Sequence, residues 1–170
     1  SFIYTIRLNW TSYDTTASVV YIMDSTKWHY VAVTIDNSRQ VKVYVDGVLG
    51  SDFYRSNVSY FYSNLFLGSS LYTNFTQYFK GSIDELRISN VVRTQKEIQD
   101  YYNFSIGGLP ILSNVVLPEP TQVLDNATIG LFHFNEASGA TFSNAVPNKQ
   151  VGTLFGASTF IKGVAGNAIN

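Results

Sequence analysis

The chain has 170 residues, enough for one well-buried domain, and 45% of them are hydrophobic while only 14% are charged. The net charge of −1 argues against a nucleic-acid partner, and no apolar run reaches the roughly 18 residues that cross a membrane. Because cysteine is absent, disulfides, thiolate metal sites and cysteine nucleophiles are excluded.

Aromatic residues make up 15% of the chain, and period-2 alternation recurs along it, so the sequence favours β-structure. It opens in a predicted strand, from which we expect a segment of a longer polypeptide. In the clearest strand, Val31, Val33 and Ile35 share one face, and Asp46-Gly47 is a strong two-residue hairpin signal. The strands predicted before residue 90 are 2–8, 18–23, 28–35, 40–46, 47–54, 65–68 and 81–88.

One short helix is predicted to follow these strands. Thr94 and Glu97 fit a capping box, in which each side chain satisfies a backbone N–H of the other residue. Three residues then fall on one face of a helix that we expect to end by Asn103: Ile98, Tyr101 and Tyr102.

Residues 105–122 contain glycines and prolines that are typical of a linker. The middle of this segment, Ile111–Leu117, is apolar, so it either packs on a domain or pairs as a strand. The tail then returns to β-structure, with predicted strands or short apolar stretches at 129–134, 152–156 and 163–169.

Three motifs resemble laminin G-like domains of the concanavalin A-like lectin family. Trp28–Val33 (WHYVAV) and Val43–Gly47 (VYVDG) are similar to the family signature W-H-x-V-A-V … Y-V-D-G. Tyr78–Ile88 resembles the family's F-x-G-x-I-D-E-V-R-I strand, and Thr94–Tyr102 resembles its closing S-x-x-E-I-x-x-L-Y segment. The resemblance implies an all-β fold, an antiparallel jelly-roll β-sandwich with one short helix.

The tail resembles the opening of such a domain, so the motifs stand out of the family's order. Leu131–Ala140 is similar to Y-W-x-F-D-E-G-S-G-T, and 152–169 is similar to G-T-L … W-x-x-G-x-x-G-N-A-L. The resemblance therefore divides the chain into the C-terminal portion of a laminin G-like sandwich, a linker or pairing strand, and the N-terminal portion of a domain, at 1–104, 105–122 and 123–170. Either the sequence spans two tandem repeats, or the tail completes a sandwich within the chain or across neighbouring chains.

The acidic residues form no pattern typical of catalysis. Glucanases among the relatives use facing carboxylates, but no E-x-D-x-x-E arrangement occurs here. Asp84 and Glu85 are adjacent and would face opposite sides of a strand. His29 and His133 lack a neighbouring Ser/Asp constellation. We therefore predict that the chain is not an enzyme and has no catalytic residues.

The resemblance also implies binding sites for calcium and for sugars. Some relatives hold Ca²⁺ at the sandwich rim, and Asp84 matches the aspartate of the family's I-D-E motif, although Lys80 stands where relatives often carry Asp. Asp84 is thus the candidate metal ligand and Ca²⁺ the candidate cofactor; alternatively, Asp84 caps a strand or pairs with Arg87. The aromatic-rich segments 60–62 and 72–79 either stack on sugars or simply pack.

Five N-glycosylation sequons favour an extracellular or cell-surface location, although a surface rich in Ser, Thr and Asn is the alternative interpretation; they begin at Asn9, Asn57, Asn74, Asn103 and Asn126. We predict a structural or adhesive module, a repeat or subunit of a cell-surface protein or filament. Its partners would be copies of itself or tandem repeats, joined by strand completion at open sheet edges. The alternative function is a lectin-like module that binds carbohydrate with calcium.

Overall fold

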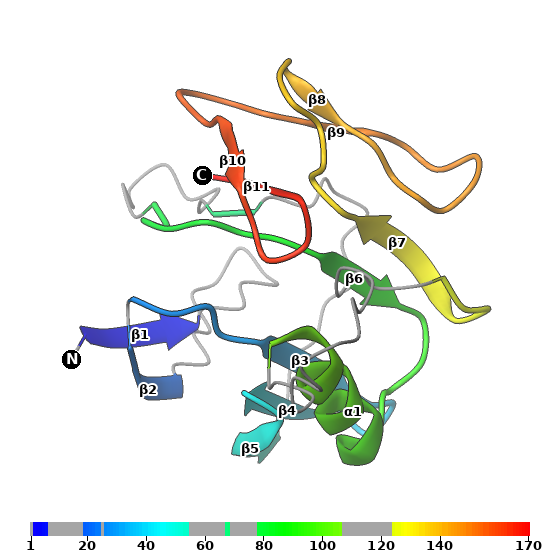
Figure 1. The fold of residues 1–170 in the computed structure, drawn as a ribbon. Helices are drawn as coiled ribbons and strands as arrows, with labels where there is room; N and C mark the ends of the chain where they lie inside the picture. Colours follow the sequence, from blue (N-terminus) through cyan, green and yellow to red (C-terminus); the bar gives the residue numbers. More distant parts are fainter. Residues whose placement is uncertain (1, 7–18, 25, 55–66, 69–77, 107–123) are drawn as a thin grey trace, which may run out of the picture. The chain divides into compact units, whose positions relative to one another are not determined.

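The computed structural model describes residues 2–6, 19–24, 26–54, 67–68, 78–106 and 124–170. In these residues the chain forms antiparallel β-strands and one short helix, which confirms the predicted all-β fold class (Figure 1). The chain divides into two compact units, residues 1–80 and residues 81–170. No helix among the described residues is long and apolar enough to cross a membrane.

In its described residues, the first unit contains five strands in two antiparallel sheets. β1 (Phe2–Ile6) pairs with β2 (Val19–Met23), and β3 (Val31–Ile35), β4 (Gln40–Val45) and β5 (Val48–Tyr54) form a meander with β4 at its centre. Among the described residues of this unit, the alternating valines of β4 belong to the core, as does Tyr44, which is 3% exposed. The valines are fully buried: Val41, Val43 and Val45.

The turns of the meander follow from local chemistry. Asp46 and Gly47 have φ angles of 52° and 76°, the left-handed conformation that a two-residue type I′ hairpin needs, so the predicted hairpin is confirmed. The preceding turn is closed by Asp36, whose carbonyl accepts from Arg39 N at 2.9 Å and whose carboxylate accepts from Gln40 N at 2.9 Å. The sequence therefore determines this part of the fold locally.

The second unit contains α1 (Gln95–Ser105) and short paired strands. β6 (Leu86–Ser89) pairs with β7 (Thr128–Phe132), β8 (Thr141–Phe142) with β9 (Gly152–Thr153), and β10 (Phe160–Lys162) with β11 (Asn167–Ile169), all antiparallel. The second edge of β7 is also covered, since Leu131 N donates to the Asn144 side chain at 3.1 Å and its carbonyl accepts from Ala145 N at 2.7 Å.

Buried aromatic residues pack at the start of the tail. Phe134 is 1% exposed, and its ring lies 5.0 Å from that of Phe142, which lies 5.5 Å from that of Phe132, both in edge-on contact. Leu131 is fully buried in the same unit. The tail therefore has core residues of its own, in addition to its strand pairing.

Several predicted elements differ in extent from the observed ones. The strand expected over 81–88 is wrong at its middle: Glu85 has a φ of 51°, so only Ile83 and then Leu86–Ser89 pair. The helix continues to Ser105, beyond the predicted end at Asn103. Residues 67–68 form a bend instead of a strand, and residues 65–66 and 107–122 lie outside the described residues. β8 and β10 were not predicted because two or three residues carry no detectable period.

Candidate functional site, the seam between residues 82–97 and the tail

Residues 82–97, which we call the docking segment, pair with residues 124–170, the tail; we call their contacts the seam. β6 and β7 are paired from Leu86–Phe132 to Ser89–Thr128, with one register shift after Ile88. Ile83 and Ile169 exchange two backbone hydrogen bonds, at 2.8 and 3.0 Å. The tail thus pairs with the docking segment of its own chain in this structure. The predicted boundaries at 104 and 123 and completion between neighbouring chains stay predictions.

Asp84 is the first polar anchor of the seam. Its Oδ2 accepts from the backbone N–H groups of Val164 at 2.7 Å and Ala165 at 3.0 Å, and its Oδ1 accepts from Glu85 N at 2.8 Å. A Cβ at Gly163 would clash with Oδ2 and would lie 2.8 Å from the backbone carbonyl oxygen of Asn167, so the close approach favours glycine here. Burial raises the pKa of Asp84, against the opposing effect of these N–H donors.

The calcium assignment of Asp84 stays a prediction. Both of its carboxylate oxygens already accept backbone hydrogen bonds, which is how a capping side chain behaves. Over the described ranges, no group of three or more His, Asp, Glu or Cys side chains is placed to hold a metal ion. A cation at Asp84 would therefore compete with amide donors for the same lone pairs.

Glu85 and His133 form the second anchor. His133 Nδ1 lies 2.8 and 3.0 Å from the two Glu85 carboxylate oxygens, and the Glu85 side chain is only 9% exposed. The expectation that Asp84 and Glu85 face opposite sides of a strand is wrong, because Glu85 is left-handed and not in a strand. Its partner, His133, is 48 residues away, and no local sequence signal reveals that contact.

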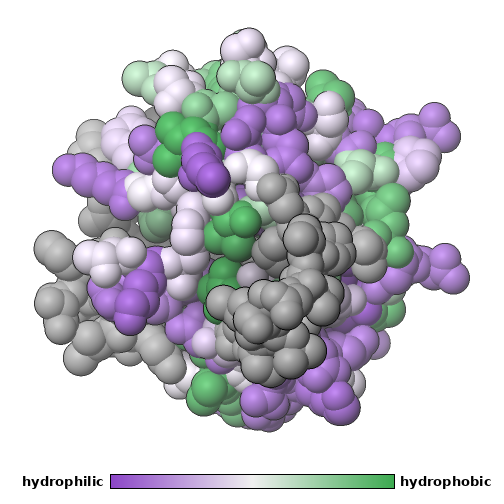
Figure 2. Space-filling model, viewed as in Figure 1, coloured by the Kyte–Doolittle hydropathy of each residue, from purple (hydrophilic) through white to green (hydrophobic). Residues whose placement is uncertain are grey.

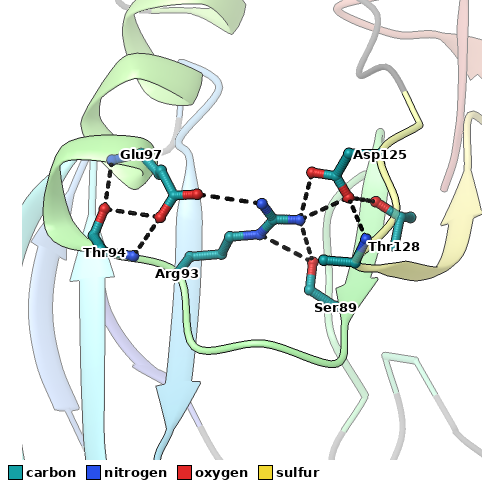
Figure 3. A network of polar contacts seen from close by, with 7 residues as sticks. Ser89, Arg93, Thr94, Glu97, Asp125 and Thr128 are labelled. Atoms are coloured by element: carbon teal, nitrogen blue, oxygen red, sulfur yellow. Dashed lines mark hydrogen bonds and ion pairs between the residues drawn. The ribbon is translucent and has the colours of Figure 1, made fainter.

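Arg93 forms the third anchor, at the centre of the network in Figure 3. Its Nη2 donates to both oxygens of Asp125, at 2.6 and 2.9 Å, its Nη1 donates to Glu97 at 3.3 Å, and its Nε and Nη2 donate to Ser89. Asp125 also accepts from the Thr128 hydroxyl at 2.7 Å. The bonds from Thr128 and then Arg93 lower the pKa of Asp125 to about 2. One guanidinium therefore joins β6, the helix start and the tail.

The predicted capping box of α1 is confirmed and shares Glu97 with this network. Thr94 N donates to Glu97 Oε2 at 2.8 Å, and Glu97 N donates to Thr94 Oγ1 at 3.2 Å (Figure 3). The Thr94 hydrogen bonds, followed by Arg93, lower the pKa of Glu97. The helix start is therefore tied to the seam, since the other Glu97 oxygen accepts from Arg93.

A separate polar clamp in the first unit joins the WHYVAV motif to the VYVDG motif. His29 Nδ1 lies 2.8 Å from Asp46 Oδ2, and Nε2 lies 3.0 Å from the carbonyl oxygen of Asp24. Tyr30 N donates to Asp46 Oδ1 at 3.0 Å. Both ring nitrogens face acceptors, so only the doubly protonated imidazolium satisfies both contacts. Burial of the ring opposes protonation, but the Asp46 and Asp24 contacts outweigh it and raise the pKa of His29.

The stabilisation by His29 is expected to be complete below about pH 6.5 and to be lost as pH rises through the higher folded-state pKa. NMR titration of the ring should give a midpoint above that of a free histidine. The decrease in thermal stability between about pH 6 and 8 should be smaller in His29→Gln, because Gln cannot titrate. A midpoint below 6.5, or an unchanged pH slope in the variant, would contradict the clamp.

The other predicted site residues fall partly within the described residues. Asn103 and Asn126 are exposed, whereas Asn9, Asn57, Asn74 and the aromatic segment 60–62 lie outside them. The Thr128 hydroxyl of the Asn126 sequon is in a buried residue and bonds Asp125, so it is occupied once the chain has folded. In the segment 72–79, only residues 78–79 are described; Tyr78 is 72% exposed and Phe79 50%.

A sequence model described as the Concanavalin A-like lectin/glucanases superfamily matches residues 4–99. The matched range contains the meander, its His29 clamp and the docking segment, and it ends within α1. Comparison with curated proteins and with solved structures found no match.

Proposed function

Because this chain belongs to the concanavalin A-like lectin/glucanases superfamily, we propose that it is a non-catalytic structural or adhesive module of an extracellular cell-surface protein or filament. Its units would be joined by strand completion, with the tail of one unit added to the docking segment of another. The partners would be further copies or tandem repeats of the same module. The exposed sequon residues Asn103 and Asn126 support the extracellular setting.

The observation that carries this proposal is the seam. The tail supplies the docking segment with a paired strand, β7, a second pairing point at Ile169, and partners for Asp84, Glu85 and Arg93. An added strand gives affinity through main-chain hydrogen bonds and specificity through side chains, and this set contains both. The carboxylates of the seam are engaged in these contacts, which supports a structural role.

Concentration decides between completion within a chain and completion between chains. Two segments of one chain meet at an effective concentration that reaches the mM range, so a dilute copy keeps its own tail. Copies crowded on a surface or in a filament reach comparable local concentrations. Under those conditions the same contacts would form between units, and no interface other than the seam would be needed, as in domain swapping.

Cysteine cross-linking tests strand completion, because the chain has no native cysteine. Ile83 and Ile169 exchange both backbone bonds, and such pairs have Cα atoms about 5.5 Å apart, within disulfide range. We expect Ile83→Cys/Ile169→Cys to form disulfides within chains when dilute and between chains as protein concentration approaches several mM. Non-reducing electrophoresis and peptide mapping distinguish the two products.

Each single-cysteine variant is the matched control, since it reports chance dimers. Linked oligomers must contain the 83–169 disulfide and exceed those of both controls. If the double variant stays entirely intramolecular over the full concentration range, the proposed assembly is wrong.

Glycan binding is the second candidate, favoured by exposed aromatic side chains. Tyr78 and Phe79 are 72% and 50% exposed. On the face of the molecule drawn in Figure 2, apolar residues lie in small groups among hydrophilic ones. Exposed aromatic rings are suited to stacking on sugars. Glycan-array binding that is lost in Tyr78→Ala/Phe79→Ala and in EDTA would support a calcium-dependent lectin. Binding that the Phe155→Ala control abolishes equally, or no binding at all, would oppose it.

A further inference from the structure

The three anchors give the docking segment a polar pattern that few strands could match. Asp84 needs two free backbone N–H groups in a turn that approaches closely through Gly163. Glu85 needs a donor one residue after the paired strand, where His133 lies. Arg93 needs a carboxylate three residues before that strand, where Asp125 lies. The segment therefore fits a tail of this sequence and not an arbitrary apolar strand.

Arg93 and Asp125 are the pair best suited to select the partner. The Arg93 side chain is 14% exposed and that of Asp125 is 36% exposed, and the carboxylate accepts two bonds from one nitrogen. Charge-assisted bonds of this kind are about twice as strong as neutral ones. A like charge at either position would be held against its counterpart, so the pair both attracts the correct tail and rejects a mismatched one.

The connection between docking segment and tail is long enough for either route. Residues 107–123 separate the described end of α1 from the tail, and about 3.3–3.6 Å per residue gives a reach of at most roughly 60 Å. That reach exceeds the diameter of a small domain, which is about 30 Å. A tail can therefore be supplied by its own chain or by a neighbour.

We propose that residues 82–97 accept the tail of a second copy of this chain, and that the Arg93–Asp125 pair is the charge lock that selects that tail. The inference rests on the proposed strand completion and specifies the partner and how it is recognised. Arg93→Asp places two acidic residues across the seam of one chain, and Asp125→Arg places two arginines there. When the two variants are mixed, they can form a dimer in which each chain gives its tail to the other. Both seams of this dimer then pair opposite charges: one pairs the two introduced charges, and the other pairs the native Arg93 with the native Asp125.

The test is a disulfide that can form only between chains. One full-length chain carries Arg93→Asp and Ile83→Cys, and the other carries Asp125→Arg and Ile169→Cys; they are mixed in urea and refolded together. The mismatched controls are Arg93→Asp/Ile83→Cys with Ile169→Cys alone, and Ile83→Cys alone with Asp125→Arg/Ile169→Cys. We expect about tenfold more 83–169 heterodimer in the matched mixture than in either mismatched one, because only the matched mixture pairs opposite charges in both seams.

A single chain with both Arg93→Asp and Asp125→Arg shows whether the exchanged charges fold. Its tail amides should regain protection from hydrogen exchange relative to either charge variant alone. Glu97 lies near position 93 in all of these variants, so it is common to the comparison. Equal heterodimer yields in the matched and mismatched mixtures would overturn the charge lock while leaving strand completion intact. If no 83–169 heterodimer forms while this double variant folds, the second copy is not the partner and completion between units fails with it.

Discussion

Asp84→Ala is expected to destabilise residues 81–170 by about 2–4 kcal/mol, because it leaves the N–H groups of Val164 and Ala165 without their acceptor. The loss concerns a half-buried site where each amide donates at 3.0 Å or less. We expect the tail to open locally, with hydrogen exchange of residues 163–169 accelerated well before the first unit unfolds. Both tryptophans, Trp10 and Trp28, belong to the first unit, so their fluorescence reports its stability separately.

Asp84→Asn is the matched control for this experiment. The amide keeps one oxygen that accepts a hydrogen bond, so the expected loss is smaller, about 1 kcal/mol. The comparison also addresses the calcium prediction. If millimolar Ca²⁺ stabilises the wild type and not Asp84→Asn, Asp84 is a metal ligand. If Asp84→Ala leaves the hydrogen exchange of the tail unchanged, Asp84 is not an anchor of the seam.

Phe134→Ala is expected to cost about 3–5 kcal/mol, the largest effect of any single substitution considered, because a buried ring leaves a cavity. Phe134 is 1% exposed and packs edge-on against Phe142. The loss should abolish the ordered tail while leaving the β3–β5 meander folded, since the valine core of the meander belongs to the other unit. Urea denaturation followed by far-ultraviolet circular dichroism, with hydrogen exchange by segment, measures it.

Phe155→Ala provides the control for aromatic loss without burial. Phe155 is 74% exposed in the same tail, so its replacement should change the free energy of unfolding by less than about 0.5 kcal/mol. Equal effects of the two substitutions would show that the aromatic cluster is not the core of the tail.

The composition of the tail is compatible with the proposed strand completion, which requires a tail that is stably folded and can exchange between units. Its own aromatic core keeps it structured, while its attachment to the docking segment uses main-chain bonds and three polar anchors. Polar attachments exchange water for protein partners, and their net contribution is modest compared with apolar burial. Mutations in the core should therefore unfold the tail, and mutations at the anchors should release it.

Local features of the fold were predictable because their causes lie within a few residues. Asp46-Gly47 favours a type I′ turn by backbone sterics alone, and Thr94 with Glu97 caps a helix by contacts three residues apart. Alternation predicts that Val41, Val43 and Val45 share one face of a strand, and all three are fully buried. The sequence by itself thus determined the fold class, the meander and the helix start.

The seam was decided only by the tertiary structure. Asp84 reaches Val164 across 80 positions, Glu85 reaches His133 across 48, and Arg93 reaches Asp125 across 32. No periodicity or motif encodes such separations, because the contacts exist only after chain topology has brought the segments together. Glu85 shows the reason most clearly: the local pattern predicts a continuous strand, whereas the residue is left-handed beside its buried contact with His133.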